Sequence, residues 1–166
     1  MSKVGEEYLN EPLSNMDLNK AILQFDHKGA QIFQDEDITQ NTPIEKIFKN
    51  RGHCIMFHKY KGSGVGHWYC LTRDKKKNVV IFDSYGRDPG FYCKNMIPCL
   101  KNNGIKNVII NKKKYQHNES AVCGRYGLAL CVYNKLGMNI EQIQKALEDG
   151  KKKYGSYDKY ILSIST

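Results

Sequence analysis

Short apolar runs separated by polar turns dominate the middle of the chain. Residues 54–58, 67–72, 79–82 and 107–111 are rich in β-branched, aromatic or other apolar side chains. Each run has the length of a strand and is bounded by glycine, asparagine or charged residues, so we predict four strands. The turn at 74–78 is short enough to join the second and third strands as a hairpin.

Apolar residues at helical spacing predict helices before and after these strands. The predicted helices cover residues 13–23, 43–48, 91–103, 123–136 and 140–153. Ser14 is the expected N-cap of the first, while Gly104 and Gly137 are the expected ends of the third and fourth. Residues 1–10 are expected to form a loose arm. This set of elements predicts one α+β domain over residues 1–166, with a short central sheet packed by helices.

Positive charge is the main feature of the composition. The chain carries a formal net charge of +9, from 26 basic and 17 acidic residues, and much of the excess lies in lysine triplets at 75–77, 112–114 and 151–153. Such a field attracts polyanions, so we expect weak, nonspecific affinity for DNA. With one tryptophan and no aromatic platform among the lysines, the sequence does not predict a dedicated reader of base sequence.

Six cysteines, at positions 54, 70, 93, 99, 123 and 131, raise the question of metal binding or disulfides. They form no Cys-x-x-Cys pair and no histidine lies at zinc-finger spacing from two of them, so we expect no metal and no cofactor. Residues 1–7 contain no apolar stretch, and the longest apolar runs are too short to cross a bilayer. We therefore expect free thiols in a reducing compartment, no secretion and no membrane association.

One cysteine occupies a position that suits catalysis. Cysteine catalysis requires a thiolate, a neighbouring imidazole, a group that orients the imidazole, and donors for the oxyanion. Cys123 follows the polar segment 115–120 and begins an apolar helix, whose N-terminal amides stabilise a thiolate. Gly124 lets a substrate backbone approach closely. A buried structural cysteine is the alternative interpretation of the same position.

His67, Asp83 and Gln116 are candidates for the remaining roles. His67 begins one strand of the predicted hairpin and Asp83 follows the other, so both fall at the same edge of the sheet. A carboxylate placed there can bond the imidazole and fix its tautomer. Gln116 can donate its side-chain amide to an oxyanion, together with the backbone N–H of Cys123. His117, beside Gln116 and closest to Cys123 in sequence, remains open as an alternative base, whereas histidines 27, 53 and 58 have less favourable contexts.

At this point three segments resemble a known group of proteases. They are residues 66–68 (Gly-His-Trp), 82–86 (Phe-Asp-Ser-Tyr-Gly) and 116–124 (Gln-His-Asn-Glu-Ser-Ala-Val-Cys-Gly). They resemble the adenovirus maturation proteases and the wider clan that includes the proteases that remove ubiquitin-like proteins. The clan has the order His, acid, Gln, Cys, which His67, Asp83, Gln116 and Cys123 match. The resemblance covers residues 54–136, about half of the chain.

The resemblance implies an adenain-like, papain-type fold with a mixed sheet and the nucleophile at a helix N-terminus. Trp68 would then pack beside the active site and help to shape the substrate groove. The implied activity is cleavage of viral capsid or core precursors next to small residues such as glycine. The implied setting is the virion and the host-cell interior (cytoplasm or viral factory), with the enzyme a monomer encoded by a virophage, a large DNA virus or a related transposon.

Some features depart from this pattern and leave alternatives open. Asp83 stands where adenoviral enzymes have glutamate, although aspartate is usual in the deconjugating branch. Adenoviral enzymes are activated by DNA and by a disulfide-linked peptide, but no cysteine here matches the one that binds the peptide. The alternatives are a deconjugating protease for ubiquitin-like modifiers, an acyltransferase of the same clan, and a non-enzymatic basic DNA-binding virion protein.

Overall fold

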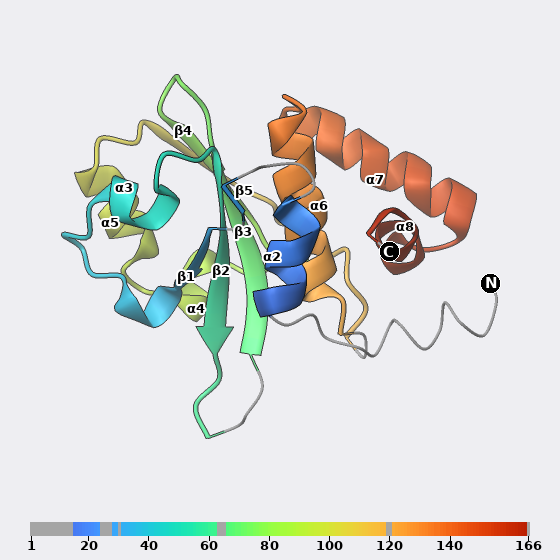
Figure 1. Cartoon of the computed structure of the whole chain (residues 1–166), viewed down its shortest axis with the longest axis horizontal. Helices are drawn as coiled ribbons and strands as arrows, with labels where there is room; N and C mark the ends of the chain where they lie inside the picture. Colours follow the sequence, from blue (N-terminus) through green and yellow to red (C-terminus); the bar gives the residue numbers. More distant parts are fainter. Residues whose placement is uncertain (1–14, 24–27, 30, 63–65, 119–120, 166) are drawn as a thin grey trace.

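A mixed five-stranded sheet forms the centre of the molecule (Figure 1). The computed structural model describes residues 15–23, 28–29, 31–62, 66–118 and 121–165. The strands are β1 (Ile32–Gln34), β2 (His53–Lys59), β3 (Gly66–Arg73), β4 (Asn78–Phe82) and β5 (Asn107–Ile110), and they lie side by side in that order. The three central strands are antiparallel, while β1 and β5 run parallel to β2 and β4.

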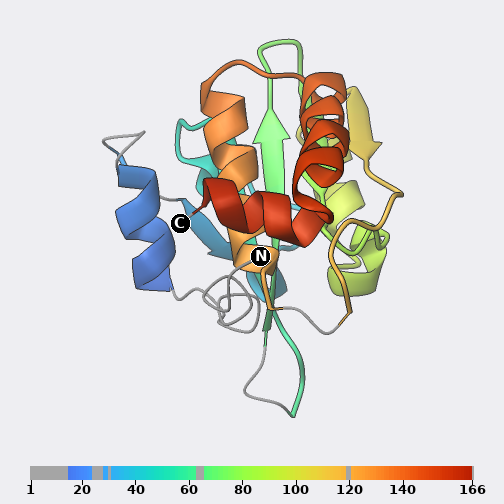
Figure 2. The ribbon, with the colours of Figure 1, turned by 90° about the vertical axis from the view of Figure 1, so that its right-hand side faces the viewer.

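Helices cover both faces of the sheet. One side carries α2 (Asn15–Leu23), α6 (Cys123–Lys135), α7 (Ile140–Tyr154) and α8 (Tyr157–Ile164). The other side carries the short helices η1 (Asp35–Asp37), α3 (Ile44–Phe48), α4 (Pro89–Tyr92) and α5 (Met96–Asn102). Figure 2 views the first side, where α8 lies across α6 and beside α7. Among the described residues, no helix is long and apolar enough to cross a membrane.

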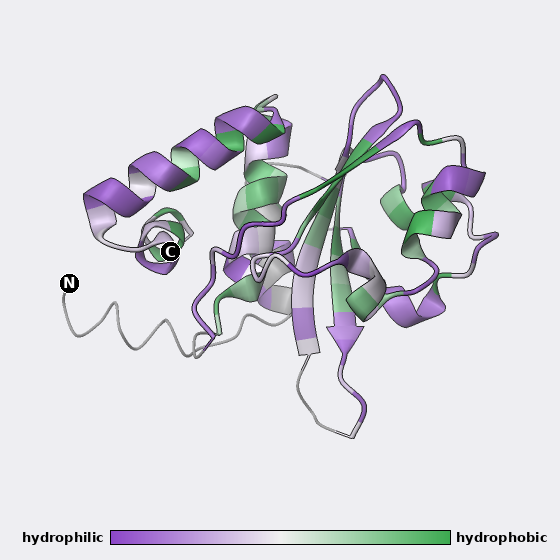
Figure 3. Cartoon of the chain, turned by 180° about the vertical axis from the view of Figure 1, so that it is seen from behind, coloured by the Kyte–Doolittle hydropathy of each residue, from purple (hydrophilic) through white to green (hydrophobic). Residues whose placement is uncertain are grey.

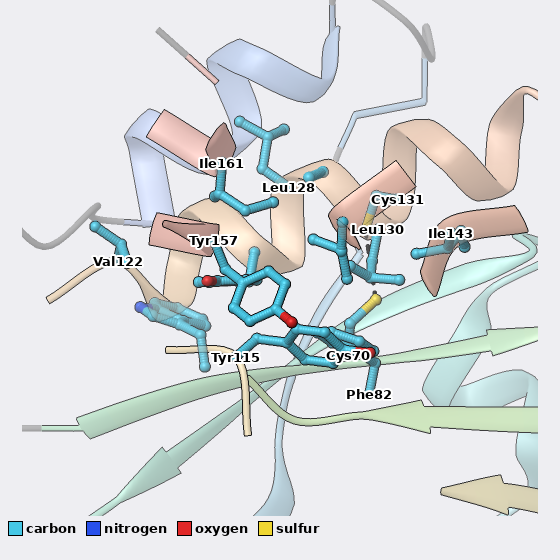
Figure 4. Close-up of a cluster of buried hydrophobic side chains, with 14 of the residues drawn as sticks. Cys70, Phe82, Tyr115, Val122, Leu128, Leu130, Cys131, Ile143, Tyr157 and Ile161 are labelled. Atoms are coloured by element: carbon cyan, nitrogen blue, oxygen red, sulfur yellow. Dashed lines mark hydrogen bonds between the residues drawn. The ribbon is translucent and has the colours of Figure 1, made fainter. Parts of the chain in front are cut away.

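Strand β3 separates two hydrophobic clusters because its side chains alternate between the faces of the sheet. Trp68 and Cys70 pack with α6 in the first cluster, which Figure 4 shows in close-up, whereas Tyr69 and Leu71 pack with α5 in the second. Apolar colouring in Figure 3 runs along the strands and α6, while α7 alternates between polar and apolar positions. Burial of apolar side chains therefore fixes α6 against the sheet. This packing holds the start of β3 close to the start of α6.

Most of the predicted elements are present. The four predicted strands and the helices at 123–136 and 140–153 are confirmed, with ends shifted by at most one residue. The mixed sheet packed by helices agrees with the predicted α+β class. The first helix is confirmed from Asn15 onward, whereas its predicted N-cap Ser14 and the arm at 1–10 lie outside the described residues. Helix α3 begins after Pro43, which is its N-cap.

The helix predicted over 91–103 is wrong in its form. The Asp88 side chain accepts a hydrogen bond from Gly90 N and starts α4 earlier, and the chain then leaves the helix at Cys93, whose φ of −145° is extended. The Cys93 thiol donates to Asp35 O at 3.5 Å. Helix α5 begins only at Met96. The break lies beside this tertiary contact, which helical spacing alone does not reveal.

Three elements were not predicted: β1, the short helix η1 and α8. Strand β1 has three residues and extends the sheet beside β2, where its pairing rather than its own pattern defines it. Helix α8 follows Gly155, and Ser156 caps it by accepting from Lys159 N. Its buried residues Tyr157, Ile161 and Leu162 are spaced as one helical face, so the sequence did contain a signal for α8.

Candidate active site

His67 and Asp83 meet at the same end of the neighbouring strands β3 and β4, as the hairpin predicted. His67 is the second residue of β3 and Asp83 directly follows β4, its antiparallel neighbour. The His67 Nε2 and Asp83 Oδ1 atoms are 2.6 Å apart, and both residues are buried. A short, buried contact of this kind fixes the orientation and the tautomer of the imidazole.

Cys123 lies on the other side of the same imidazole. It is the first residue of α6, and its thiol is hydrogen-bonded to the His67 ring. The N-cap Val122 has no polar side chain to bond the amides of the first turn, and Cys123 occupies the first position of the helix, where the dipole favours negative charge. Cys123 is half-buried, whereas the other five cysteines are buried. The structure thus brings a half-buried thiol, an imidazole and a carboxylate together.

The protonation states of His67 and Asp83 follow from these contacts. Burial alone lowers the pKa of His67, but hydrogen bonds to Asp83 and Cys123 outweigh burial and raise the pKa to about 9. Burial raises the pKa of Asp83, but the hydrogen bond and charge of His67, with further donors, hold that pKa below its usual range. The arrangement therefore favours an ionised Asp83 beside an imidazolium at neutral pH, which is the state that a thiolate partner requires.

Three neighbours hold Asp83 in place. Its Oδ2 accepts from Arg87 N at 3.0 Å and from Tyr92 Oη at 2.9 Å. The Asn111 side chain bonds the backbone of Asp83 twice, accepting from its N–H at 2.8 Å and donating to its carbonyl at 2.6 Å. Because every oxygen of the carboxylate has a fixed partner, Asp83 cannot rotate without losing hydrogen bonds.

Aromatic rings fix the imidazole as well. The rings of Tyr85 and Tyr92 each lie 5.0 Å from the His67 ring, at interplanar angles of 30° and 20°. Tyr92 therefore contacts both members of the pair, since its hydroxyl reaches Asp83 and its ring stacks on His67. These stacked contacts restrict the side-chain rotation of His67 and help to shape the surface next to Cys123.

Gln116 is held beside Asp83 through Ser84. The Ser84 hydroxyl donates to Gln116 Oε1 at 2.6 Å, and the Ser84 carbonyl accepts from the backbone N–H of both Tyr115 and Gln116 at 2.8 Å. Gln116 is 1% exposed. The Oε1 end of Gln116 is therefore bonded to Ser84, which restricts the rotation of the side chain.

The structure also shows the positions of His117, the alternative base, and of Trp68 and Gly124, which were expected at the substrate groove. The exposed His117 is anchored through its backbone N–H, which donates to Asp158 Oδ2 at 3.1 Å. His58 pairs with Asp35 at 2.9 Å. Trp68 is 6% exposed and packs on Phe57, with ring centroids 4.6 Å apart. Gly124 is buried in the first turn of α6.

Comparison with known proteins adds information about the fold. No family model matches the sequence, and no curated protein matches it. The crystal structure of the ASFV pS273R protease is similar to this structure with a TM-score of 0.50 and 13% sequence identity, over 77% of this chain. The chain shares its fold with this protease. It spans 60% of that protein's length, and at this level of identity the likeness concerns the fold alone.

Several residues that build the site were not anticipated. Ser84, Tyr92 and Asn111 orient Gln116, Asp83 or the chain around them, although none of them has a reactive side chain. Ser84 follows Asp83 directly, so its position near the site was visible in the sequence. Tyr92 and Asn111 follow Asp83 by 9 and 28 residues and depend on the packing of α4 and β5 for their positions.

The pH dependence of activity gives a first prediction. In the wild type, cleavage should fall as pH rises through about 9, because the imidazolium of His67 then loses its proton. In Asp83→Asn the largest raising contribution is lost while burial remains, so the pKa of His67 should fall. The alkaline limb of the pH–rate profile should then move to lower pH by about one unit or more. The maximal cleavage rate should also fall roughly 10²-fold or more. A limb that stays in place in this variant would argue against the role of Asp83.

Proposed function

We propose that the chain is a cysteine endopeptidase in which Cys123 is the nucleophile and His67 the base. The observation that carries the proposal is the bonding of one buried imidazole to a carboxylate on one side and to a half-buried thiol on the other. This is the geometry that activates a nucleophile. The fold shared with a protease is consistent with this use of the site.

The reaction follows from the positions of these groups. The Cys123 thiol gives its proton to His67, and the sulfur attacks the carbonyl carbon of a peptide bond. The Gln116 side-chain amide and the backbone N–H of Cys123 are the proposed donors to the oxyanion. When the intermediate collapses, His67 gives its proton to the leaving amine. Water, deprotonated by His67, then attacks the thioester, which releases the acid product and restores the thiol.

The order and spacing of the catalytic residues resemble those of adenovirus-type maturation proteases, and this supports a narrower proposal. We propose that the substrates are viral capsid or core precursor proteins, cut next to small residues such as glycine. A half-buried thiol suits such sequences, because a small side chain lets an extended backbone approach it closely. A deconjugating protease for ubiquitin-like modifiers uses the same chemistry and differs only in its substrate.

A peptide library derived from a whole proteome tests both levels of this proposal. Incubation with the reduced protein should generate new peptide ends, identified by mass spectrometry, that are missing with Cys123→Ala. Glycine or another small residue should be enriched next to the cut. Cleavage without that enrichment would reject the proposed specificity and keep the enzyme, whereas the absence of Cys123-dependent cuts would reject the endopeptidase.

Charge supports a second proposal, that DNA binds the protein without sequence preference. The Nζ atoms of Lys113 and Lys151 lie 5.2 and 4.9 Å from the centre of the Tyr157 ring, so two of the lysine triplets are neighbours in the fold. Added duplex DNA should alter the cleavage rate at low salt, and this effect should disappear as salt rises. An effect that does not depend on salt, or no effect at low salt, would contradict the proposal.

A further inference from the structure

The start of helix α8 contacts the residues on both sides of Gln116. The Tyr157 ring meets the Tyr115 ring edge to face, with centroids 4.9 Å apart. Asp158 Oδ2 accepts from His117 N at 3.1 Å. Gln116 therefore lies on a segment that is held both by Ser84, in the turn after β4, and by the start of α8.

The second carboxylate oxygen of Asp158 reaches the nucleophile helix. Asp158 Oδ1 accepts from Tyr126 Oη at 2.8 Å, and Tyr126 lies three residues after Cys123 on α6. Asp158 and Tyr126 are 6% and 1% exposed, so these bonds are shielded from water. Arg125 Nη1 also donates to Ser165 O at 3.0 Å, which joins the first turn of α6 to the end of α8.

One buried carboxylate thus joins the two segments that supply the proposed oxyanion donors. The Gln116 side chain and the backbone N–H of Cys123 come from different segments, and both must point at one developing charge. We propose that Asp158 is a positioning residue that keeps both donors directed at the same oxyanion. The inference rests on the proposed function, since it assigns Asp158 to the oxyanion step of that reaction.

The position of Asp158 separates its role from that of Asp83. Asp83 bonds the imidazole, so it acts on the formation of the thiolate. Asp158 bonds His117 N and Tyr126 Oη, and neither of these groups is part of the pair of His67 and Cys123. A change at Asp158 should therefore impair acyl transfer, which needs an oxyanion hole, and spare simple alkylation of the thiol, which does not.

The variant Asp158→Ala tests this separation. Alanine has no hydrogen-bonding side chain, so His117 N and Tyr126 Oη both lose their bond to residue 158. Asparagine would not serve, because its Oδ1 can accept from His117 N while its NH₂ group donates to the Tyr126 hydroxyl oxygen. Two rates are compared: alkylation of Cys123 by iodoacetamide, and turnover of the best-cleaved library peptide carrying a fluorophore and a quencher. We expect kcat to fall about tenfold to a hundredfold while the alkylation rate stays within about twofold.

Matched variants make the outcome specific. Asp149→Ala makes the same change at an exposed carboxylate on α7 and should leave both rates unchanged. Tyr126→Phe removes one of the two bonds and should lower kcat less than Asp158→Ala, again without slowing alkylation. This second variant keeps a test available if Asp158→Ala does not fold.

The alternatives give different results. If alkylation and turnover fall together, Asp158 only supports the fold, and the inference is rejected. If neither rate changes, Asp158 has no positioning role. If the wild type shows neither selective alkylation of Cys123 nor cleavage, the proposed function itself fails, and the inference fails with it.

Discussion

Cys123→Ala is expected to abolish cleavage while leaving the fold intact. Cys123 contributes the only half-buried thiol among the six cysteines, and it is bonded to His67 at the start of α6. The substitution removes the proposed nucleophile, so turnover should fall by about 10⁴-fold or more. The substitution removes a single sulfur atom, and the free energy of unfolding should change by about 1 kcal/mol or less.

Cys99→Ala is the matched control for this variant. Cys99 is buried in α5 on the opposite side of the sheet, where its thiol donates to Thr42 O at 3.3 Å. Its replacement should lower stability modestly and leave the turnover of the folded protein unchanged. Turnover of the library peptides by Cys123→Ala at a rate near that of the wild type would show that the nucleophile has been assigned to the wrong residue.

His67→Ala is expected to remove both cleavage and the selective reactivity of Cys123. The imidazole takes the proton of the thiol and later gives it to the leaving amine, so turnover should fall roughly 10²- to 10⁴-fold. The change also leaves the Asp83 carboxylate buried without its cationic partner, which costs about 3 kcal/mol of stability. His67→Gln retains a polar side chain and is the better choice if the alanine variant is unstable.

His117→Ala is the matched control for the base. His117 is exposed and its backbone N–H makes the contact to Asp158, so the variant keeps that contact. We expect turnover close to that of the wild type. If His117→Ala were inactive while His67→Ala retained turnover, the roles of the two histidines would have to be exchanged.

The central part of the site could be predicted because His67 and Asp83 lie on two strands that one short hairpin joins. The turn at 74–78 joins β3 to β4, so a histidine at the start of one and an aspartate at the end of the other had to meet at one edge. Cys123 could be placed because an apolar helix begins there. Its closeness to His67 required the packing of α6 on β3, which the pattern of buried residues suggests but does not determine.

The supporting contacts could not be predicted for a physical reason. Tyr92 reaches Asp83 from α4, a separate short helix that begins at Pro89. Asp158 reaches His117 and Tyr126 only because α8 folds back across α6. Both contacts join segments whose relative position depends on tertiary packing, and a polar residue in a terminal helix carries no local sign of such a role.

The most direct test of the central claim is the reactivity of the cysteines. The reduced native protein would be treated with limiting iodoacetamide at about pH 6, and the modified cysteines would be mapped by mass spectrometry. We expect selective modification of Cys123 that disappears in His67→Gln, because only a thiolate paired with an imidazolium reacts at this pH. Slow modification of all six cysteines alike, unchanged in His67→Gln, would contradict an activated nucleophile at Cys123.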